Sequence, residues 1–381
     1  MDRSRPWGLY VHLPWCRYRC PYCAFVVDAR KDPPHEAYEI ALVREWRLRR
    51  SLFVGAPDSL YFGGGTPSRS PLSTFDALIQ AIQPLAGAEI TAEANPEDVS
   101  PQLLADWKRV GVTRVSLGVQ SFFPEVGAKL GRRRGSRVAR EAVERTAEAG
   151  FRSFSIDLIF GGPGQSEEAW EAELEEVEDL GVPHVSLYGL TQEEGTAFGR
   201  LGERLERAED ERWRWMYDHA VQRLAAMGIH RYEVSNFARG GHESVHNQHY
   251  WHPDPWLGLG VGAHSWWPDR RRAQNRADIQ GYLEAADPAE EAEPADHPLA
   301  AWDYLWSMLR HRDGIDRARY QELTGLSLKI PSTLVDFLEE TPEKIRLRPA
   351  GYPVADAVAR RLYDALPSMK RRSPSPVRAA P

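Results

Sequence analysis

Short runs of mostly apolar residues recur along the first 240 residues and alternate with segments of helical periodicity. The apolar runs cover residues 7–13, 58–62, 89–93, 113–119, 154–160 and 184–190. Apolar residues at consecutive positions are typical of strands that are buried on both faces, as in a parallel sheet covered by helices. The pattern therefore predicts six buried strands.

Amphipathic segments between these runs predict helices at residues 36–50, 72–83, 101–109, 137–149 and 167–180. Several of them end at a glycine, as in ERTAEAGF and EVEDLGV, which fits a left-handed helix C-cap. Repeated strand–helix units of this kind connect with right-handed crossovers. Six such units can form a full or partial (β/α) barrel or an open doubly wound sheet, and periodicity alone does not choose between these α/β folds.

The pattern changes after residue 240, and we divide the chain there. The predicted parts are a strand–helix core (1–240), a His/Trp-rich segment with an acidic linker (241–298), a small, mainly helical C-terminal domain (299–366) and a disordered basic tail (367–381). Helices are predicted at 208–227, 299–310, 316–323, 331–340 and 354–366, with a hairpin near 344–350. The linker is read from residues 284–298, which are acidic and rich in Ala and Pro.

Composition narrows the class of protein. The 381 residues carry a net charge of −7, which gives no overall electrostatic reason to bind nucleic acid or an anionic membrane. No apolar run approaches the roughly 20 residues of a membrane span, and the N-terminus does not read as a secretory signal. An odd count of three cysteines then argues for a reducing compartment. We expect a cytoplasmic protein with no transmembrane segment and no nucleic-acid partner.

All three cysteines, Cys16, Cys20 and Cys23, lie in one loop after the first predicted strand, with the spacing C-x3-C-x2-C. Zinc could be bound by these thiolates together with His12 or another histidine. An iron–sulfur cube normally takes four cysteine thiolates, so three would leave one iron open to an exchangeable ligand. The residues alone leave both metal centres open.

This spacing resembles the signature loop of the radical S-adenosylmethionine (SAM) superfamily. The resemblance implies a [4Fe–4S] cluster whose fourth iron chelates the amino and carboxylate groups of SAM. An electron from the cluster then cleaves the C–S bond of SAM and yields a 5′-deoxyadenosyl radical.

Polar and glycine residues at the ends of predicted strands could form a pocket for SAM, because ligand sites in such folds lie where strands end. The run YFGGGTP (61–67) lets the backbone approach a ligand closely, although glycines after a strand are most often a simple turn. Glu93, Gln120 and Asp157 each end or interrupt an apolar run. A buried carboxylate needs a cation, a donor or solvent, and a structural salt bridge is the plainer explanation for each one singly.

The ordered motifs LYVHLPWCRYRCPYC, YFGGGTP, AEANP, SLGVQSF, DLIFGGPGQ and VSLYGLT resemble the coproporphyrinogen dehydrogenase-like branch of radical SAM proteins. The resemblance implies a partial (β/α)6 barrel and assigns Cys16, Cys20 and Cys23 to the cluster. The residues that it assigns to SAM are Tyr10, Tyr22, Gly64, Gly65, Thr66, Glu93, Gln120, Arg132, Asp157, Gly189 and His264. From its sequence context alone, Arg132 would be read as part of a solvated surface patch.

Two groups within this branch must be separated. The oxygen-independent coproporphyrinogen III dehydrogenases carry a further cysteine two residues after the third, where this chain has Phe25. They also have an N-terminal extension, whereas 15 residues precede Cys16 here. Both differences speak against this enzyme, which stays the alternative function.

The heme chaperone group of the branch has an H-N-x-x-Y-W motif, and this chain reads HNQHYW at 246–251. His246 could ligate heme iron, as histidines do elsewhere, and Tyr250 and Trp251 could cover the macrocycle. Without the resemblance, His246 would be read as a histidine that lines a loop. The resemblance implies a heme chaperone that delivers heme to recipient proteins and forms a homodimer. No catalytic acid, base or nucleophile emerges from the sequence.

Overall fold

The computed structural model describes residues 6–132, 135–205, 208–252, 254–269, 271–290, 293–294 and 297–366. The tail predicted to be disordered, residues 367–381, lies outside these ranges.

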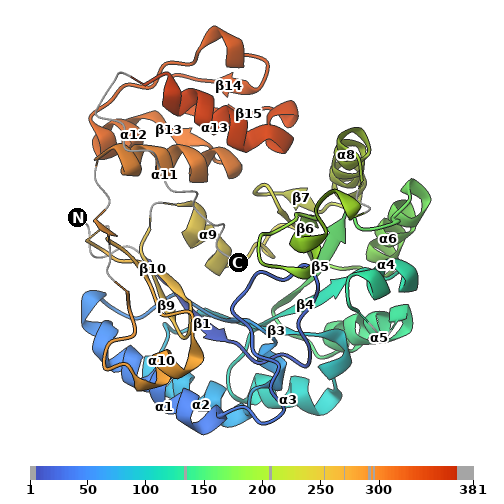
Figure 1. The fold of residues 1–381 in the computed structure, drawn as a ribbon. Helices are drawn as coiled ribbons and strands as arrows, with labels where there is room; N and C mark the ends of the chain where they lie inside the picture. Colours follow the sequence, from blue (N-terminus) through green and yellow to red (C-terminus); the bar gives the residue numbers. More distant parts are fainter. Residues whose placement is uncertain are drawn as a thin grey trace.

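Six parallel strands form the centre of the fold and confirm the six predicted ones. They are β1 (Gly8–Leu13), β2 (Ser59–Gly64), β3 (Glu89–Ala94), β4 (Arg114–Gln120), β5 (Ser153–Phe160) and β6 (His184–Gly189). They pair with one another in chain order. Because the sheet curves and its helices cover the outer side (Figure 1), the α/β class and the partial barrel are confirmed.

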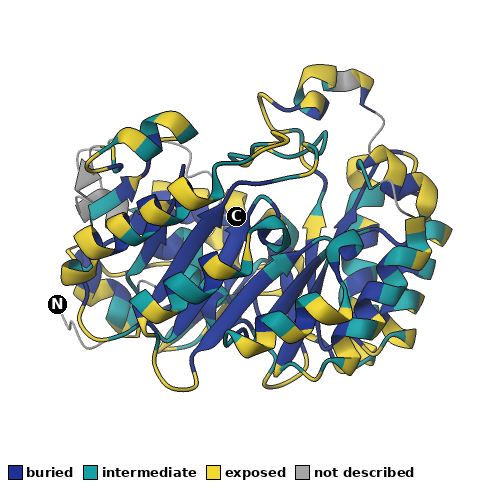
Figure 2. Cartoon of the chain, turned by 90° about the horizontal axis from the view of Figure 1, so that it is seen from below, coloured by how far each residue is buried: buried dark blue, intermediate teal, exposed yellow. Residues whose placement is uncertain are grey.

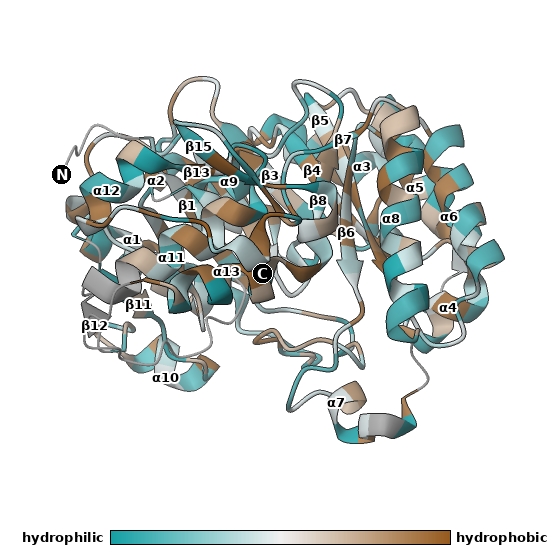
Figure 3. Cartoon of the chain, turned by 90° about the horizontal axis from the view of Figure 1, so that it is seen from above, coloured by the Kyte–Doolittle hydropathy of each residue, from teal (hydrophilic) through white to brown (hydrophobic). Residues whose placement is uncertain are grey.

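The helices of the repeat are α1 (His35–Arg49), α2 (Leu72–Ile82), α3 (Pro101–Arg109), α4 (Pro124–Lys129), α5 (Gly135–Glu148), α6 (Glu167–Asp179) and α8 (Asp210–Ala226). The outer faces of these helices are exposed, whereas the strands are buried (Figure 2). The helices carry hydrophilic residues on one side and hydrophobic residues on the other (Figure 3). Local chemistry fixes several starts. Ser100 accepts a hydrogen bond from the Leu103 amide and caps α3, and Ser166 caps α6 in the same way.

The strands are buried on both faces, but only one face is apolar. In β1 and β2 the outward residues Leu9, Val11, Leu60 and Phe62 belong to the hydrophobic core. The residues between them point to the concave side, because side chains alternate along a strand. These inward residues are largely polar and bond to one another. The pairs include Ser116 with Ser155 (Oγ–Oγ 2.7 Å), Arg114 with Ser153 (Nη1–Oγ 2.9 Å), and Tyr61 with Glu93 (OH–Oε1 2.7 Å).

Further strands extend the sheet at both edges. Beyond β1 lie β9 (Trp256–Leu259), β10 (His264–Trp266), β11 (Arg271–Gln274) and β12 (Glu293–Pro294), and beyond β6 lie β8 (Asn236–Ala238) and β7 (His230–Arg231). Much of the predicted His/Trp-rich segment therefore joins the barrel sheet, and β12 comes from the acidic stretch predicted to be a linker. Helix α9 (Val245–Trp251) lies on the concave side of the sheet (Figure 1).

Glu45 of α1 fastens these added strands to the barrel. Its carboxylate accepts hydrogen bonds from the Gly260 amide (2.9 Å), the Asn275 side chain (2.7 Å) and the Tyr282 hydroxyl (2.7 Å). Tyr282 belongs to the short helix α10 (Ile279–Glu284). Burial nevertheless raises the pKa of Glu45 to about 7, because the three donors only partly replace the lost hydration.

The C-terminal domain contains α11 (His297–Arg310), β13 (Ile315–Asp316), α12 (Arg317–Thr324), β14 (Leu338–Glu340), β15 (Lys344–Leu347) and α13 (Ala355–Asp364). The helix predicted at 331–340 is wrong, because residues 338–340 pair with β15 and bury Leu338 opposite Leu347. Trp251 of α9 packs against Trp306 of α11, with ring centroids 6.0 Å apart. In the described ranges, no helix has the length and apolar character to span a membrane.

Candidate cluster and cofactor site

The cysteine loop (residues 15–28) follows directly from the carboxyl end of β1 and is closed at its neck. The Cys16 amide donates to the Asp28 carbonyl (2.8 Å), and the Asp28 amide donates to the Pro14 carbonyl (2.8 Å). Within the loop, the Cys23 amide donates to the Cys20 carbonyl (3.1 Å), which forms a tight turn. All three thiols are free and partly exposed. The fold therefore holds all three cysteines in one short closed loop that follows β1.

The chemistry of the thiols fits a metal cluster. Burial raises the pKa of Cys16 to about 11, and the hydrogen bond from the Thr66 hydroxyl (3.5 Å) opposes this only in part. Burial raises the pKa of Cys23 in the same sense. Metals bind thiolates, so cluster binding must release these protons. With no fourth cysteine in the chain, a cube held here would have one iron without a cysteine.

The glycine run after β2 lies directly against the cysteine loop. The Gly65 amide donates to the Leu13 carbonyl (2.9 Å), and the Thr66 amide donates to the Trp15 carbonyl (2.9 Å). A Cβ on Gly65 would lie 2.6 Å from the Pro14 carbonyl carbon. A Cβ on Gly64, whose φ is +109°, would lie 2.5 Å from the His12 ring. Glycine is therefore needed at these two positions because the backbone passes too close to His12 and Pro14 for a side chain, so the run is more than a simple turn.

Two partly buried carboxylates lie on the inward face near the strand ends. Glu93 of β3 accepts hydrogen bonds from the Tyr61 hydroxyl (2.7 Å) and the Gly64 amide (3.2 Å), and burial raises its pKa to about 7. Asp157 of β5 accepts from the Ser116 hydroxyl (3.3 Å), and burial raises its pKa to about 6. Among the residues the structure describes, neither has an ion-pair partner. A cationic or donor-rich ligand such as SAM would supply what both lack.

A chain of hydrogen bonds connects the cysteine loop to Arg132. Thr66 donates to the Cys16 thiol, Asn95 donates to the Thr66 hydroxyl (Nδ2–Oγ1 3.1 Å), and Arg132 donates to the Asn95 side chain (Nη1–Oδ1 2.5 Å). The Nε of Arg132 is buried without a protein partner, so a carboxylate ligand would satisfy it. Arg132 is therefore linked to the cysteine loop through Asn95 and Thr66 and is not a fully solvated surface residue, and its role in SAM binding stays a prediction. Sequence reasoning missed Asn95, although it stands in the quoted AEANP motif.

The remaining residues assigned to SAM lie at different distances from this centre. Tyr10 is buried on the inward face, where its hydroxyl is 3.0 Å from the His12 Nδ1 atom. Tyr22 lies in the cysteine loop between Cys20 and Cys23 and packs against a small apolar cluster. Gln120 ends β4 with a φ of +67°, a left-handed conformation that is rare for a residue other than glycine.

Gly189 and His264 lie at the margins of the site. A Cβ on Gly189, which ends β6, would lie 2.6 Å from the Trp213 ring, so this glycine makes room for an indole. His264 begins β10 and is exposed, and β9, β1 and β2 separate it from β3. Their assignment to SAM stays a prediction. The residues that the structure does bring together, from Gly64 to Asp157, line the carboxyl ends of consecutive strands, where (β/α) folds hold their ligands.

The HNQHYW motif forms helix α9, on the inward face but nearer the amino ends of the strands. The His246 ring is buried and stacks on Tyr61, with centroids 5.0 Å apart. Its Nδ1 lies 3.1 Å from the Ser59 hydroxyl and its Nε2 lies 2.8 Å from the Tyr250 hydroxyl. The Glu89 carboxylate accepts from the His246 amide (3.1 Å) and so holds the first turn of α9 on β3.

This packing bears on the predicted role of His246. Burial lowers its pKa well below the ordinary value, so the ring is neutral. Both ring nitrogens are engaged, and neither is free to bind iron in this arrangement. Iron ligation by His246 requires that the bond to Tyr250 or to Ser59 opens. That role therefore stays a prediction that depends on a movement of α9.

Comparisons with known proteins agree with this arrangement. The family model described as the radical SAM superfamily matches residues 10–177. The heme chaperone HemW of Escherichia coli is 35% identical, over 86% of this chain and 88% of that protein. HemW of Bacillus subtilis is 33% identical, over 87% and 91%, and HemW of Mycobacterium tuberculosis is 38% identical, over 69% and 72%.

Among solved structures, the coproporphyrinogen III oxidase HemN from Escherichia coli covers 95% of this chain and 91% of its own, with a TM-score of 0.82. Its sequence identity is 23%, so this likeness concerns the fold. The family model and the curated relatives carry the assignment further, since the radical SAM superfamily implies a [4Fe–4S] cluster and SAM. The chain belongs to the HemW family of heme chaperones within the radical SAM superfamily.

Proposed function

We propose that this protein is a cytoplasmic heme chaperone that holds a [4Fe–4S] cluster, SAM and heme, and delivers heme to recipient proteins. The observation that carries the proposal is the relationship to HemW proteins over most of both chains. The HNQHYW sequence and Phe25, at the position where the dehydrogenases of this branch have a further cysteine, support the same assignment.

In this proposal the three cysteines would hold the cluster, and residues at the neighbouring strand ends would hold SAM. When bound, the cluster supplies an electron that can cleave SAM. Gly64 and Glu93 would receive the amino group of SAM, Arg132 would pair with its carboxylate, and Asp157 would meet the adenosine part. Among these residues, Arg132 has a buried Nε atom without a protein partner, and burial raises the pKa values of Glu93 and Asp157.

Heme would bind where α9 meets the C-terminal domain. Trp251 lies there against Trp306 and offers a flat apolar surface. Tyr250 and His246 follow along the same helix, one turn apart. Heme would first contact the partly exposed Trp251 and Tyr250, and the opening of α9 would then release His246 to the iron. Transfer to a recipient would reverse these steps, and the proposed homodimer is the state in which we expect it to occur.

The test is a heme titration of the purified protein, followed by absorption spectroscopy. His246→Ala should weaken binding and change the spectrum of the bound iron. His219→Ala is the matched control, because this histidine lies on α8, in the outer layer of helices away from α9 (Figure 1), and is paired with Glu171 of α6. Equal binding by the wild type and His246→Ala would remove His246 from the proposed role.

A separate assay tests the function as a whole. Reduced, cluster-loaded protein should not convert coproporphyrinogen III to protoporphyrinogen in anaerobic buffer. Turnover in this assay would favour the dehydrogenase and contradict the chaperone proposal.

A further inference from the structure

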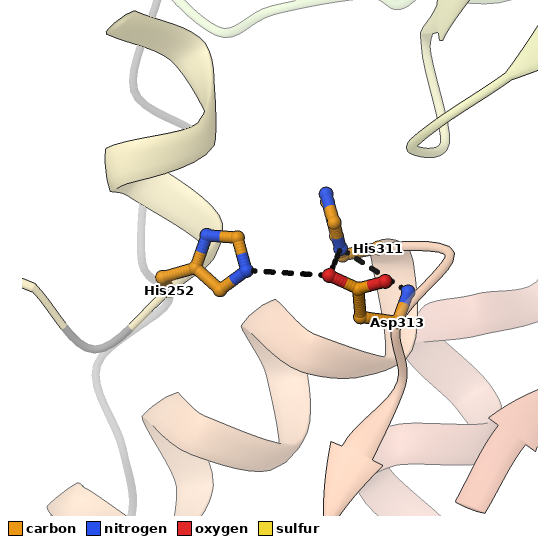
Figure 4. Close-up of side chains that lie close together, drawn as sticks. All are labelled: His252, His311 and Asp313. Carbon is orange, nitrogen blue, oxygen red and sulfur yellow. Dashed lines mark hydrogen bonds and ion pairs between the residues drawn. The ribbon is translucent and has the colours of Figure 1, made fainter. Parts of the chain in front are cut away.

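Two histidines and an aspartate meet where α9 joins the C-terminal domain. His252 directly follows α9, His311 directly follows α11, and Asp313 lies in the turn before β13. One ligand atom from each lies within 4.8 Å of the others (Figure 4). The Asp313 Oδ2 atom is 3.7 Å from the His252 Nε2 atom and 3.4 Å from the His311 Nδ1 atom. Neither the proposed cluster nor the proposed heme site uses these side chains.

Hydrogen bonds fix which ring nitrogens carry protons. The His252 Nδ1 atom lies 3.0 Å from the Gln248 carbonyl, which can only accept, so Nδ1 carries the proton of the neutral ring. The Asp313 amide donates to the His311 Nδ1 atom (3.2 Å), so this nitrogen carries no proton, and a metal ion bound there would replace the amide hydrogen bond. The three possible ligand atoms therefore lie together, and the His311 Nδ1 lone pair becomes available when its bond from the Asp313 amide opens. The Asp313 carboxylate pairs with the His252 ring in the protein alone, and a divalent cation between the three atoms would replace that pair.

The spacing and surroundings suit a metal ion. Ligands bound to tetrahedral zinc at about 2.0–2.1 Å lie about 3.4 Å from one another, close to two of the separations seen here. Histidines that bind metal usually donate their other ring N–H to a carbonyl or carboxylate, as His252 does to Gln248. His311 is 1% exposed, whereas 49% of the Asp313 side chain is exposed, so the site is walled on one side and open on the other.

We propose that His252 Nε2, His311 Nδ1 and Asp313 Oδ2 bind a divalent metal ion of the zinc class. Imidazole and carboxylate donors suit Zn²⁺ among the divalent ions. Three protein ligands leave a fourth position for water or a ligand on the open side. Because His252 ends the helix that carries HNQHYW and the other two ligands belong to the C-terminal domain, the ion fixes the end of α9 to that domain. The metal therefore restrains the helix whose opening the heme proposal requires.

The experiment is equilibrium dialysis of the full-length, cluster-loaded chain against Zn²⁺ under anaerobic conditions, with metal counted per chain. The cluster must be loaded because free thiols also bind zinc. We expect one Zn²⁺ per chain, with at least a tenfold loss of affinity in His252→Gln and in Asp313→Asn. His219→Gln removes a histidine that is paired with Glu171 but belongs to no three-ligand group among the residues the structure describes, and it should bind zinc as the wild type does.

Two further measurements separate this site from the thiols and from misfolding. The chain with Cys16, Cys20 and Cys23 changed to serine should still bind one Zn²⁺. Zinc should raise the thermal midpoint of the wild type and of His219→Gln, but not that of Asp313→Asn. Two results would overturn the proposal. One is that the cluster-loaded wild type binds no Zn²⁺, and the other is that His252→Gln and Asp313→Asn both bind Zn²⁺ as tightly as the wild type.

Discussion

A single methyl group on Gly65 should separate the two loops that form the cluster site. Its Cβ would lie 2.6 Å from the carbonyl carbon and 2.7 Å from the carbonyl oxygen of Pro14, both backbone atoms that cannot rotate away. Ordinary contact begins at 3.4 Å, so the glycine run and the cysteine loop must move apart by about 0.8 Å.

The cost of this movement follows from the bonds that join the loops. The Gly65–Leu13 and Thr66–Trp15 backbone hydrogen bonds are each 2.9 Å long. A displacement of that size stretches them to about 3.7 Å, beyond a useful hydrogen bond. Two lost bonds at about 0.5–1.5 kcal/mol each lower the free energy of unfolding by about 1–3 kcal/mol. The neck of the cysteine loop, which begins at Pro14, is displaced at the same time.

The assay compares Gly65→Ala with Gly240→Ala. Gly240 is exposed, and a Cβ there meets nothing within 4 Å. Gly240→Ala therefore lowers the conformational entropy of the unfolded chain as Gly65→Ala does, but introduces no clash in the folded protein. We expect Gly65→Ala to unfold at lower urea concentration and to hold less iron and sulfide per chain after anaerobic reconstitution. Equal stability and equal iron content in the two variants would refute the reasoning.

Three other changes test other parts of the structure. Glu93→Gln removes a partly buried carboxylate that would face cationic SAM, so anaerobic dialysis should show SAM affinity at least tenfold weaker, and unchanged affinity would contradict this. Tyr250→Phe frees one His246 nitrogen at the cost of one hydrogen bond, about 0.5–1.5 kcal/mol, so heme should bind about two- to tenfold tighter in titrations; weaker binding would count against His246. Glu45 has its pKa raised to about 7 in the folded state, so folding favours its protonated form and wild-type stability falls as pH rises from about 4.5 to 7. Relative to wild type, Glu45→Gln should therefore be more stable to urea at pH 8 than at pH 5, and a pH-independent difference would contradict the assigned pKa.

Much of the barrel could be predicted because its outer shell follows simple periodicities. The predicted helices at 72–83, 101–109 and 167–180 agree with the structure to within a residue at either end, since each has an apolar stripe and the last two begin after a serine cap. The closure of the sheet could not be predicted from periodicity, because a strand has the same pattern in a barrel and in an open sheet. It came from the family resemblance.

The parts that sequence reasoning missed depend on contacts between distant segments. Residues 331–340 have helical spacing, but pairing of β14 with β15 and burial of Leu338 outweigh it. Asn95 carries no chemical signature of its own, and its role appears only when Thr66 and Arg132 lie on either side of it. The motif sequence likewise suggested a free His246, whereas Ser59 and Tyr250 occupy both ring nitrogens.

The alternation of apolar and polar faces along the barrel strands has a consequence for how the sequence can drift. Outward positions such as Val115 and Leu117 are fully buried among helices, so they tolerate exchange between apolar side chains of similar volume. Their inward neighbour Ser116 forms hydrogen bonds with Ser155 and Asp157. An apolar residue at position 116 would remove one hydrogen bond from each of them. Tolerance to substitution along β4 should therefore alternate from one residue to the next. Outward positions should accept apolar side chains of similar volume, whereas inward positions should accept only side chains that keep the hydrogen bonds.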